Sequence, residues 1–116
     1  MGIHWTDTAI RILQALKSDK DASVFLKPVD TVRYKIPHYL QVVSNPMDLG
    51  TISDKLAHHQ YDSPQEYLDD VELVFANCIL FNGHDNPYSK KAVALRAKFE
   101  RLQDQMMFGF WLPETN

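Results

Sequence analysis

The strongest constraint on the fold lies in residues 63–82, which have the pattern of one long amphipathic helix. Ser63, Pro64 and Glu66 form the signature of a capping box with proline in the first helical turn. The apolar residues that follow at helical spacing are Tyr67, Val71, Val74, Phe75 and Cys78. This stripe predicts a helix that packs against others through one face. Asn82 ends the stripe on the same face, so it either caps the helix or turns inward to hold a polar group.

Three further segments show a helical period, at about 6–17, 48–57 and 86–106. The first segment can be capped by Thr6 or Asp7 and the second by Asp48. The third can be capped by Asn86, with Pro87 in its first turn. Their apolar positions are Ile10, Ile12, Leu13 and Leu16, then Leu49, Ile52 and Leu56, then Ala92, Leu95, Phe99, Leu102 and Met106. Four helices with short second and third connections predict an all-α antiparallel four-helix bundle.

The connection between the first two helices, residues 23–45, has no sustained period of 2 or 3.6. It contains Pro28 and Pro37 and several aromatic residues at irregular positions. We therefore predict a long loop, and loops of this length in compact domains usually have a function. Its many apolar side chains indicate that it packs against the bundle.

The composition indicates one soluble domain. With 116 residues, 45% apolar and 23% charged, the chain has enough side chains for a single core. The net charge of -3 argues against a nucleic-acid backbone as ligand and favours basic partners. Cys78 is the only cysteine, so an internal disulfide is excluded, and no apolar run approaches the roughly 18 residues that span a bilayer. Gly2 and Thr6 match the loose myristoylation pattern, a minor interpretation because short patterns recur by chance.

The residue pattern gives little support to catalysis or metal binding. The adjacent His58 and His59 diverge by about 100° on a helix, and Cys78, His84 and Asp85 lack metal-ligand spacing. A small buried hydrophobe is the favoured interpretation of Cys78. We therefore expect no catalytic residue, no metal and no cofactor, and we do not expect an enzyme.

Two long runs carry a specific resemblance. The run FLKPVDTVRYKIPHYLQVVSNPMDLGTISDKL, followed by YDSPQEYLDDVELVFANCILFN, resembles the bromodomain in the order and spacing of its motifs. These motifs are Pro28-Val29-Asp30, Pro37 with Tyr39, Asn45-Pro46-Met47-Asp48-Leu49, and Asn77-Cys78 with Asn82. The resemblance implies a left-handed four-helix bundle that reads acetylated lysine. We expect the domain to span residues 6–112, with tails at 1–5 and 113–116.

The resemblance also implies roles for individual residues. Asn82 falls on the asparagine that donates its side-chain amide to the acetyl carbonyl, and Tyr39 on the tyrosine that reaches the same carbonyl through a water. Val29, Tyr34 and Ile36 fall on loop positions that wall the pocket. Phe25 matches the last residue of a Trp-Pro-Phe shelf and would contact the acetyl methyl. Tyr88 falls on the gatekeeper position.

The chain departs from the family pattern at several of these positions. Ser23 and Val24 replace the first two residues of the shelf, so its apolar surface is reduced. Phe81 stands before Asn82 where tyrosine is common, and Leu40 replaces a frequent second tyrosine. Tyr88 is bulky for a gatekeeper and should narrow the entrance. We expect acetyl-lysine recognition with altered breadth.

The chemistry of acetylation fits such a pocket. Acetylation removes the lysine charge and leaves an amide on an apolar stem, whereas an unmodified ammonium would be desolvated with no carboxylate evident to pair it. We expect acetylated histone tails or other acetylated proteins as partners, in chromatin or transcription regulation, without direct contact to nucleic acid or membrane. We expect a monomeric domain within a larger protein or complex, in the nucleus, with the cytoplasm as the alternative.

Two alternatives remain open at this point. Asn82 could be a C-terminal cap in the left-handed conformation before Gly83, and Tyr34, Tyr39 and Tyr88 could be core aromatics. The whole chain could instead be a helical interaction scaffold that uses no acetyl-lysine pocket.

Overall fold

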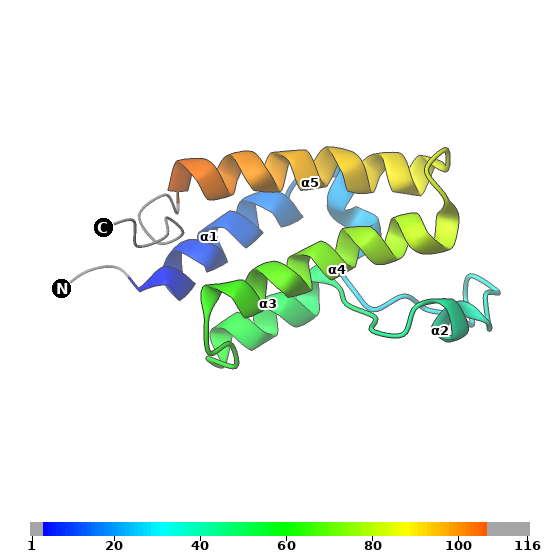
Figure 1. Ribbon diagram of the computed structural model, residues 1–116, viewed down its shortest axis with the longest axis horizontal. Helices are drawn as coiled ribbons and strands as arrows, with labels where there is room; N and C mark the ends of the chain where they lie inside the picture. Colours follow the sequence, from blue (N-terminus) through cyan, green and yellow to red (C-terminus); the bar gives the residue numbers. More distant parts are fainter. Residues whose placement is uncertain (1–3, 107–116) are drawn as a thin grey trace.

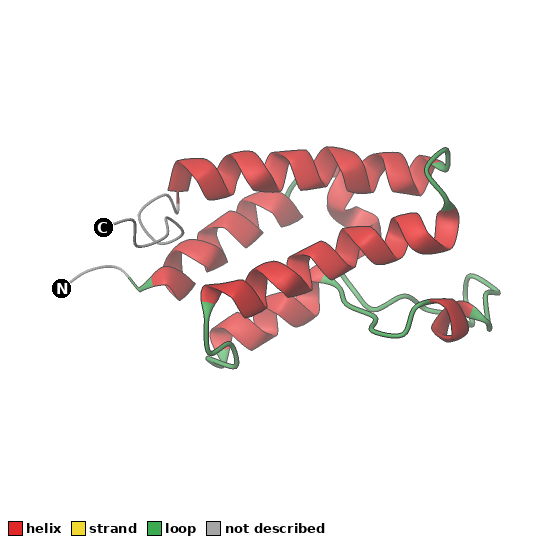
Figure 2. Ribbon diagram, viewed as in Figure 1, coloured by secondary structure: helices red, strands yellow, loops and turns green. Residues whose placement is uncertain are grey.

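The computed structural model describes residues 4–106, and over this range the chain is built of helices and loops without strands (Figures 1 and 2). The elements are α1 (Trp5–Lys17), the 3-10 helix η1 (Lys20–Phe25), α2 (Tyr39–Val42), α3 (Leu49–Ala57), α4 (Pro64–Asn82) and α5 (Pro87–Met106). α4 packs along α5, and α1 packs against both α3 and α5. The predicted all-α four-helix bundle is therefore confirmed.

The cap of α1 differs from the prediction. The helix begins at Trp5, and the imidazole of His4 accepts a hydrogen bond from the backbone N–H of Thr6 at 3.2 Å. Neither Thr6 nor Asp7 is the cap, because the histidine ring already satisfies a free N–H of the first turn. The inward face of α1 is formed by Ala9, Ile12, Leu13 and Leu16, whereas Ile10 is only half-buried.

The connection between α1 and α3 is less irregular than predicted. Asp19 accepts a hydrogen bond from the N–H of Asp21 at 2.8 Å and caps η1. A single helical turn, α2, is closed by the N–H of Val43, which donates to the carbonyl oxygen of Tyr39 at 2.8 Å. The expectation of a loop without regular structure was wrong here, because elements this short are held by local bonds and carry no amphipathic period.

The predicted caps of α3 and α4 are confirmed. Asp48 accepts from both the N–H and the hydroxyl of Thr51, at 2.9 and 2.7 Å. Ser63 accepts from the N–H of Glu66 at 3.4 Å. The Glu66 side chain accepts a hydrogen bond from the N–H of Asp62 at 3.0 Å. A capping box would instead use the N–H of Ser63, one residue later.

The core joins the inward faces of all four long helices with η1. Its fully buried large side chains include Ile12, Leu13, Leu16, Leu49, Ile52, Leu56, Tyr67, Val71, Phe75 and Leu95. At the end of α5 the prediction was partly wrong. Leu102 is half-buried and Met106 is 39% exposed, while Gln103 takes the buried position and accepts a hydrogen bond from the Tyr67 hydroxyl at 3.1 Å.

Two loops meet at the end of the bundle away from the start of α1 and the end of α5 (Figure 1). One is the long connection that contains α2, and the other is the short loop of residues 83–86 between α4 and α5. Among residues 4–106, no helix has the length and apolarity to cross a membrane. Gly2, of the myristoylation pattern, lies outside the described residues. Residues 107–112, the end of the expected domain, lie outside them too, so the expected domain boundaries stay a prediction.

Candidate functional site

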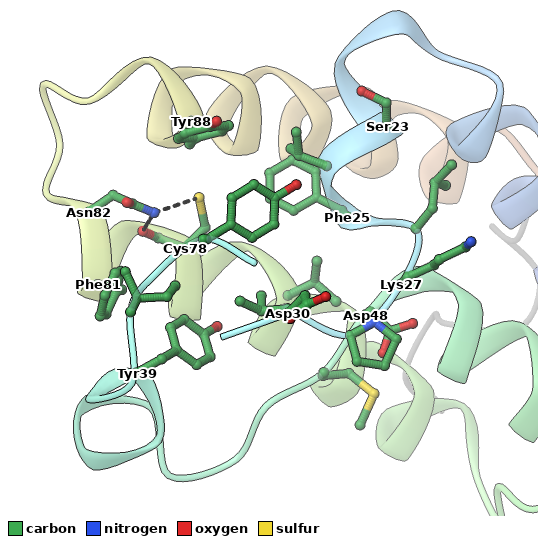
Figure 3. Close-up of a pocket in the computed structure, with 18 of the residues that line it drawn as sticks. Ser23, Phe25, Lys27, Asp30, Tyr39, Asp48, Cys78, Phe81, Asn82 and Tyr88 are labelled. Atoms are coloured by element: carbon green, nitrogen blue, oxygen red, sulfur yellow. Dashed lines mark hydrogen bonds between the residues drawn. The ribbon is translucent and has the colours of Figure 1, made fainter. Parts of the chain in front are cut away.

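A cavity of about 720 Å³ lies where the two loops meet (Figure 3). Its walls come from the segment that runs from η1 through α2, from the last turns of α4 and from the first turn of α5. All nine residues predicted for the site line it: Val24, Phe25, Val29, Tyr34, Ile36, Tyr39, Phe81, Asn82 and Tyr88. The structure thus brings together residues that lie up to 64 positions apart in the sequence.

Asn82 is the last residue of α4 and is half-buried. Its Nδ2 donates to the carbonyl oxygen of Cys78 at 3.0 Å and approaches the Cys78 sulfur at 3.6 Å (Figure 3). Asn82 itself is helical, and the positive φ at the end of α4 occurs at Gly83, with φ 84° and ψ 157°, so Asn82 is not a left-handed cap. Because a side-chain amide carries two hydrogens and an acceptor oxygen, the bond to Cys78 fixes its orientation and leaves capacity for a ligand.

Tyr39 and Phe81 form one wall. Tyr39 is only 6% exposed, and its ring packs on Phe81 with centroids 4.9 Å apart. His38 lies on Phe81 as well, at 5.3 Å. Figure 3 shows the Tyr39 hydroxyl directed into the cavity. Burial raises the pKa of Tyr39, so this hydroxyl stays protonated and can donate across the neutral range.

Phe25 belongs to both the core and the cavity. It is 7% exposed, and its ring meets Phe75 edge-on at 6.2 Å. The neighbouring Val24 is half-buried, and Ser23 is exposed at the cavity margin. Ser23 and Val24 thus present no aromatic side chain at this part of the cavity margin.

The outer rim consists of more exposed side chains. Val29, Tyr34 and Tyr88 are 38%, 55% and 42% exposed, and Ile36 is half-buried. The exposure of Tyr34 rules out the core interpretation of this residue. The guanidinium of Arg33 lies over its ring, 5.8 Å from the centroid. Tyr88 is the second residue of α5, and its N–H donates to the side chain of Asn86 at 2.8 Å.

The site prediction missed about half of the lining residues. These are Ser23, Leu26, Lys27, Pro28, Asp30, Arg33, Met47, Asp48, Val74 and Cys78. Val74 and Cys78 could have been found, since they share the helix face of Asn82 at spacings of eight and four residues. The loop residues carry no periodic signal that reveals which side chains turn inward.

Two carboxylates line the cavity, whereas the sequence had made none evident that could pair with a bound ammonium. Asp30 accepts hydrogen bonds from the N–H groups of Val32 and Arg33 at 3.1 and 2.9 Å. Asp48 is 4% exposed, and both of its oxygens bond to Thr51. These bonds hold the carboxylates in local turns, because aspartate at a cap or turn satisfies free backbone donors.

Cys78 lies beside Asn82 at the inner end of the cavity. Burial raises the pKa of the Cys78 thiol, and hydrogen bonding to Asn82 and Ser89 offsets part of the shift. The thiol is therefore neutral near pH 7 and a poor nucleophile. Within residues 4–106, no group of three or more His, Cys, Asp or Glu side chains could hold a metal ion.

The fold and the cavity define a class of protein: a small helical bundle that presents a half-apolar pocket between two loops at one end. The bromodomain family model matches residues 10–94, and the chain belongs to this family. The resemblance seen in the sequence is thus confirmed, and bromodomains are reader modules without catalytic activity. As a bromodomain, this domain is therefore a non-catalytic module.

Curated relatives agree with this assignment. The chain is 43% identical over 97 residues to "SWR1 complex bromodomain subunit bdf1" of Schizosaccharomyces pombe, covering 84% of this chain and 17% of that protein. It is 46% identical over 99 residues to "Bromodomain-containing factor 1" of Candida albicans, covering 85% and 14%. It is 39% identical over 89 residues to "Transcription factor GTE11" of Arabidopsis thaliana, covering 77% and 14%. The chain therefore spans less than a fifth of these relatives.

Proposed function

We propose that the cavity binds the side chain of Nε-acetylated lysine in a protein tail. The observation that carries this proposal is the side-chain amide of Asn82, oriented by its 3.0 Å bond to Cys78 and placed in a cavity that Tyr39 and Phe25 also line. Asn82 would donate to the acetyl oxygen, and Tyr39 would reach the same oxygen through a water. Phe25 and Val29 would contact the methyl group and the stem.

Discrimination against unmodified lysine follows from charge. An ammonium ion would leave water for a partly apolar cavity, at a cost that only a free carboxylate could offset. Asp30 and Asp48 are engaged by backbone N–H groups, and Asp48 also by the Thr51 hydroxyl. The acetylated side chain has no charge to desolvate, so it is the favoured form.

The affinity for one acetyl mark should be modest. Burial of the methyl and stem contributes about 3 to 4 kcal/mol, and a neutral hydrogen bond adds about 1 kcal/mol. Association entropy opposes much of this sum, which gives a dissociation constant of about tens of micromolar or weaker. A second mark or a second module would supply the additional affinity in a cell.

We further propose that the domain acts in a larger nuclear protein that reads acetylated histone tails or other acetylated proteins. The names of the relatives, which include a subunit of a complex and a transcription factor, support a role in chromatin or transcription. The short share of each relative that the chain spans supports its being one module among others.

The proposal is tested by titrating the full chain, labelled with ¹⁵N, with a pair of peptides that differ only in acetylation of one lysine. The acetylated peptide should shift the signals of Tyr39, Cys78 and Asn82, and the unmodified peptide should not. Equal shifts with both peptides, or shifts that avoid these residues, would indicate a helical interaction scaffold instead.

A further inference from the structure

The cavity lies at the more cationic end of an acidic chain. The whole chain has a net charge of -3. Residues 23–48 nevertheless contain Lys27, Arg33 and Lys35 against Asp30 and Asp48. The excess of acidic residues therefore belongs to the rest of the bundle, and two cations, Lys27 and Arg33, line the cavity itself.

Building on the proposed function, we propose that Lys27 and Arg33, together with Ser23, select tails that carry an anionic side chain next to the acetylated lysine. The ligand chemistry is a carboxylate, from aspartate or glutamate, or the phosphate of a phosphoserine. This selectivity would be opposite to the preference for basic partners that the net charge suggests.

Both cations are available to a ligand. Lys27 and Arg33 are exposed, and neither takes part in an ion pair within residues 4–106. Three other cations are engaged, in the pairs Lys55–Asp70, Arg96–Glu72 and Lys98–Asp19 at 2.7 to 3.0 Å. Lys27 can therefore meet an anionic partner without first breaking an ion pair, and Arg33 can do so while its guanidinium stays over the Tyr34 ring, 5.8 Å from the centroid.

The two carboxylates of the cavity equal the two cations in number, but among the described residues they form no ion pair with them. Oδ1 of Asp30 accepts from two backbone N–H groups, and Asp48 is a buried helix cap. Hydrogen bonds from N–H groups spread and stabilise a carboxylate charge, which lowers its demand for a cationic partner. The Lys27 and Arg33 side chains therefore keep their capacity for an external anion.

The position of these groups suits a residue flanking the acetyl-lysine. Figure 3 places Lys27 and Ser23 across the cavity from Asn82, where the acetyl group would bind. A cavity of 720 Å³ is in the range of about 300 to 1,000 Å³ that holds drug-sized ligands. It therefore has room for peptide atoms beyond one acetylated side chain. The Ser23 hydroxyl adds a neutral donor to the two cations at this margin.

The effect should be moderate and sensitive to salt. Contacts between exposed charges change an affinity by about two- to fivefold. Raising the ionic strength from about 0.05 M to about 0.5 M shortens the Debye length to a few ångströms and should remove most of the preference. A preference made by apolar contacts would not respond in this way.

The test uses the full chain and a series of peptides that share one acetylated lysine. They differ in the residue next to the acetyl-lysine, which is glutamate, phosphoserine, glutamine or lysine, and this residue is placed before or after the acetyl-lysine. Calorimetry or fluorescence anisotropy gives each affinity. Glutamate or phosphoserine should bind about two- to fivefold more tightly than glutamine at low salt, and lysine more weakly. Comparing the affinities of the glutamate and phosphoserine peptides shows whether the site prefers a carboxylate or a phosphate.

Variants locate the preference. In the double variants Lys27→Glu with Arg33→Glu, and Lys27→Gln with Arg33→Gln, the ratio of glutamate to glutamine affinity should fall to one or below. The double variant Arg11→Glu with Arg101→Glu is the matched control for the Glu variant. It changes the net charge by the same amount, at exposed residues that do not line the cavity, so it should keep the ratio of glutamate to glutamine affinity. Thermal melts confirm that each variant is folded.

The outcomes separate this inference from the proposed function. If all four acetylated peptides bind equally, or if the Lys27 and Arg33 variants keep the preference, the inference about anionic flanks is wrong while acetyl-lysine binding stands. If no peptide binds in an acetylation-dependent manner, the proposed function itself fails.

Discussion

The side-chain Nδ2 of Asn77 donates a hydrogen bond to the carbonyl oxygen of Asn45 at 2.8 Å, although the two residues are 32 positions apart. Asn77 is 7% exposed and lies on α4 between Val74 and Cys78, which both line the cavity. At the other end of the loop, the N–H of Gly50 donates to the carbonyl oxygen of Leu26 at 3.1 Å. These two bonds tie the loop that carries Tyr39 to the bundle.

Replacing Asn77 by Ala should loosen the loop. The substitution leaves a carbonyl group of Asn45 without its donor, which costs about 1 to 3 kcal/mol of unfolding free energy. Chemical denaturation measures this loss, and affinity for an acetylated peptide should fall along with it. Gln14→Ala, at an exposed position of α1, is the control and should change stability by less than about 0.5 kcal/mol. An unchanged stability in Asn77→Ala would show that the bond to Asn45 is not an anchor.

Gly50 should tolerate no side chain. A Cβ at this position would collide with the carbonyl oxygen of Leu26, a backbone atom. Gly50→Ala should therefore destabilise the fold by about 1 to 3 kcal/mol through overpacking and displace the segment next to the cavity. Asp54→Ala, on the exposed face of the same helix, is the matched control. NMR shifts around Leu26 in the first variant only would support the account, and a Gly50→Ala protein as stable as the control would contradict it.

Tyr39 allows the hydroxyl to be tested apart from the ring. Tyr39→Phe keeps the contact with Phe81 but removes the group directed into the cavity. Loss of about 1 kcal/mol of hydrogen bonding predicts about a fivefold weaker affinity for acetylated peptide. Since burial raises the pKa of Tyr39, the affinity of the unaltered chain should not change through this hydroxyl between pH 6 and about pH 9. Calorimetry at several pH values checks both statements, and an unchanged affinity in Tyr39→Phe would remove the hydroxyl from the site.

Much of the fold could be predicted because its signals are periodic. The face of α4 from Tyr67 to Cys78 and the caps at Asp48 and Ser63 each rest on a local pattern with a direct physical cause. The errors have local causes too. The His4 cap uses a side chain outside the common capping residues, and η1 and α2 are too short to show a period.

The site could be predicted only through the family resemblance. Spacing alone could not decide between a cap and an inward donor for Asn82, because the answer depends on where a distant loop folds. The residues that resemblance did not name, such as Lys27 and Arg33, lie in that loop and show their position only in three dimensions. The roles of the nine predicted residues stay predictions until a ligand is observed.

Alkaline pH should destabilise the fold through its buried tyrosines. The Tyr61 hydroxyl donates to Asp70 at 2.6 Å, and Lys55 bonds the same carboxylate oxygen at 2.7 Å. Burial, followed by the bond to Asp70, raises the pKa of Tyr61, so the folded state holds this proton more tightly than the unfolded state. Its contribution to stability is full below about pH 10 and is lost as the pH rises further, by up to about 1.4 kcal/mol per pH unit.

Chemical denaturation from pH 8 to pH 11 measures this slope. Tyr61→Phe should lower stability by about 1 kcal/mol at pH 8 and make the decline above pH 10 shallower. An equally steep decline in the variant would assign the alkaline sensitivity to other groups, among them Tyr67, whose pKa burial also raises.

Asn82 should matter to binding far more than to folding. Among residues 4–106, its side chain bonds within its own helix, to Cys78, and it is half-buried. Asn82→Ala should therefore change the unfolding free energy by less than about 2 kcal/mol while acetyl-dependent binding disappears. Calorimetry and thermal melts of the same preparation measure both, and a variant that keeps the distinction between acetylated and unmodified peptides would contradict the assigned role.

The most direct measurement is a crystal structure of the chain with a bound acetyl-lysine peptide. The account predicts that the acetyl oxygen lies about 3 Å from Nδ2 of Asn82, with a water between that oxygen and the Tyr39 hydroxyl and with the methyl group against Phe25. A peptide bound outside the cavity, or an acetyl group inside it that makes no hydrogen bond to Asn82, would contradict the central claim.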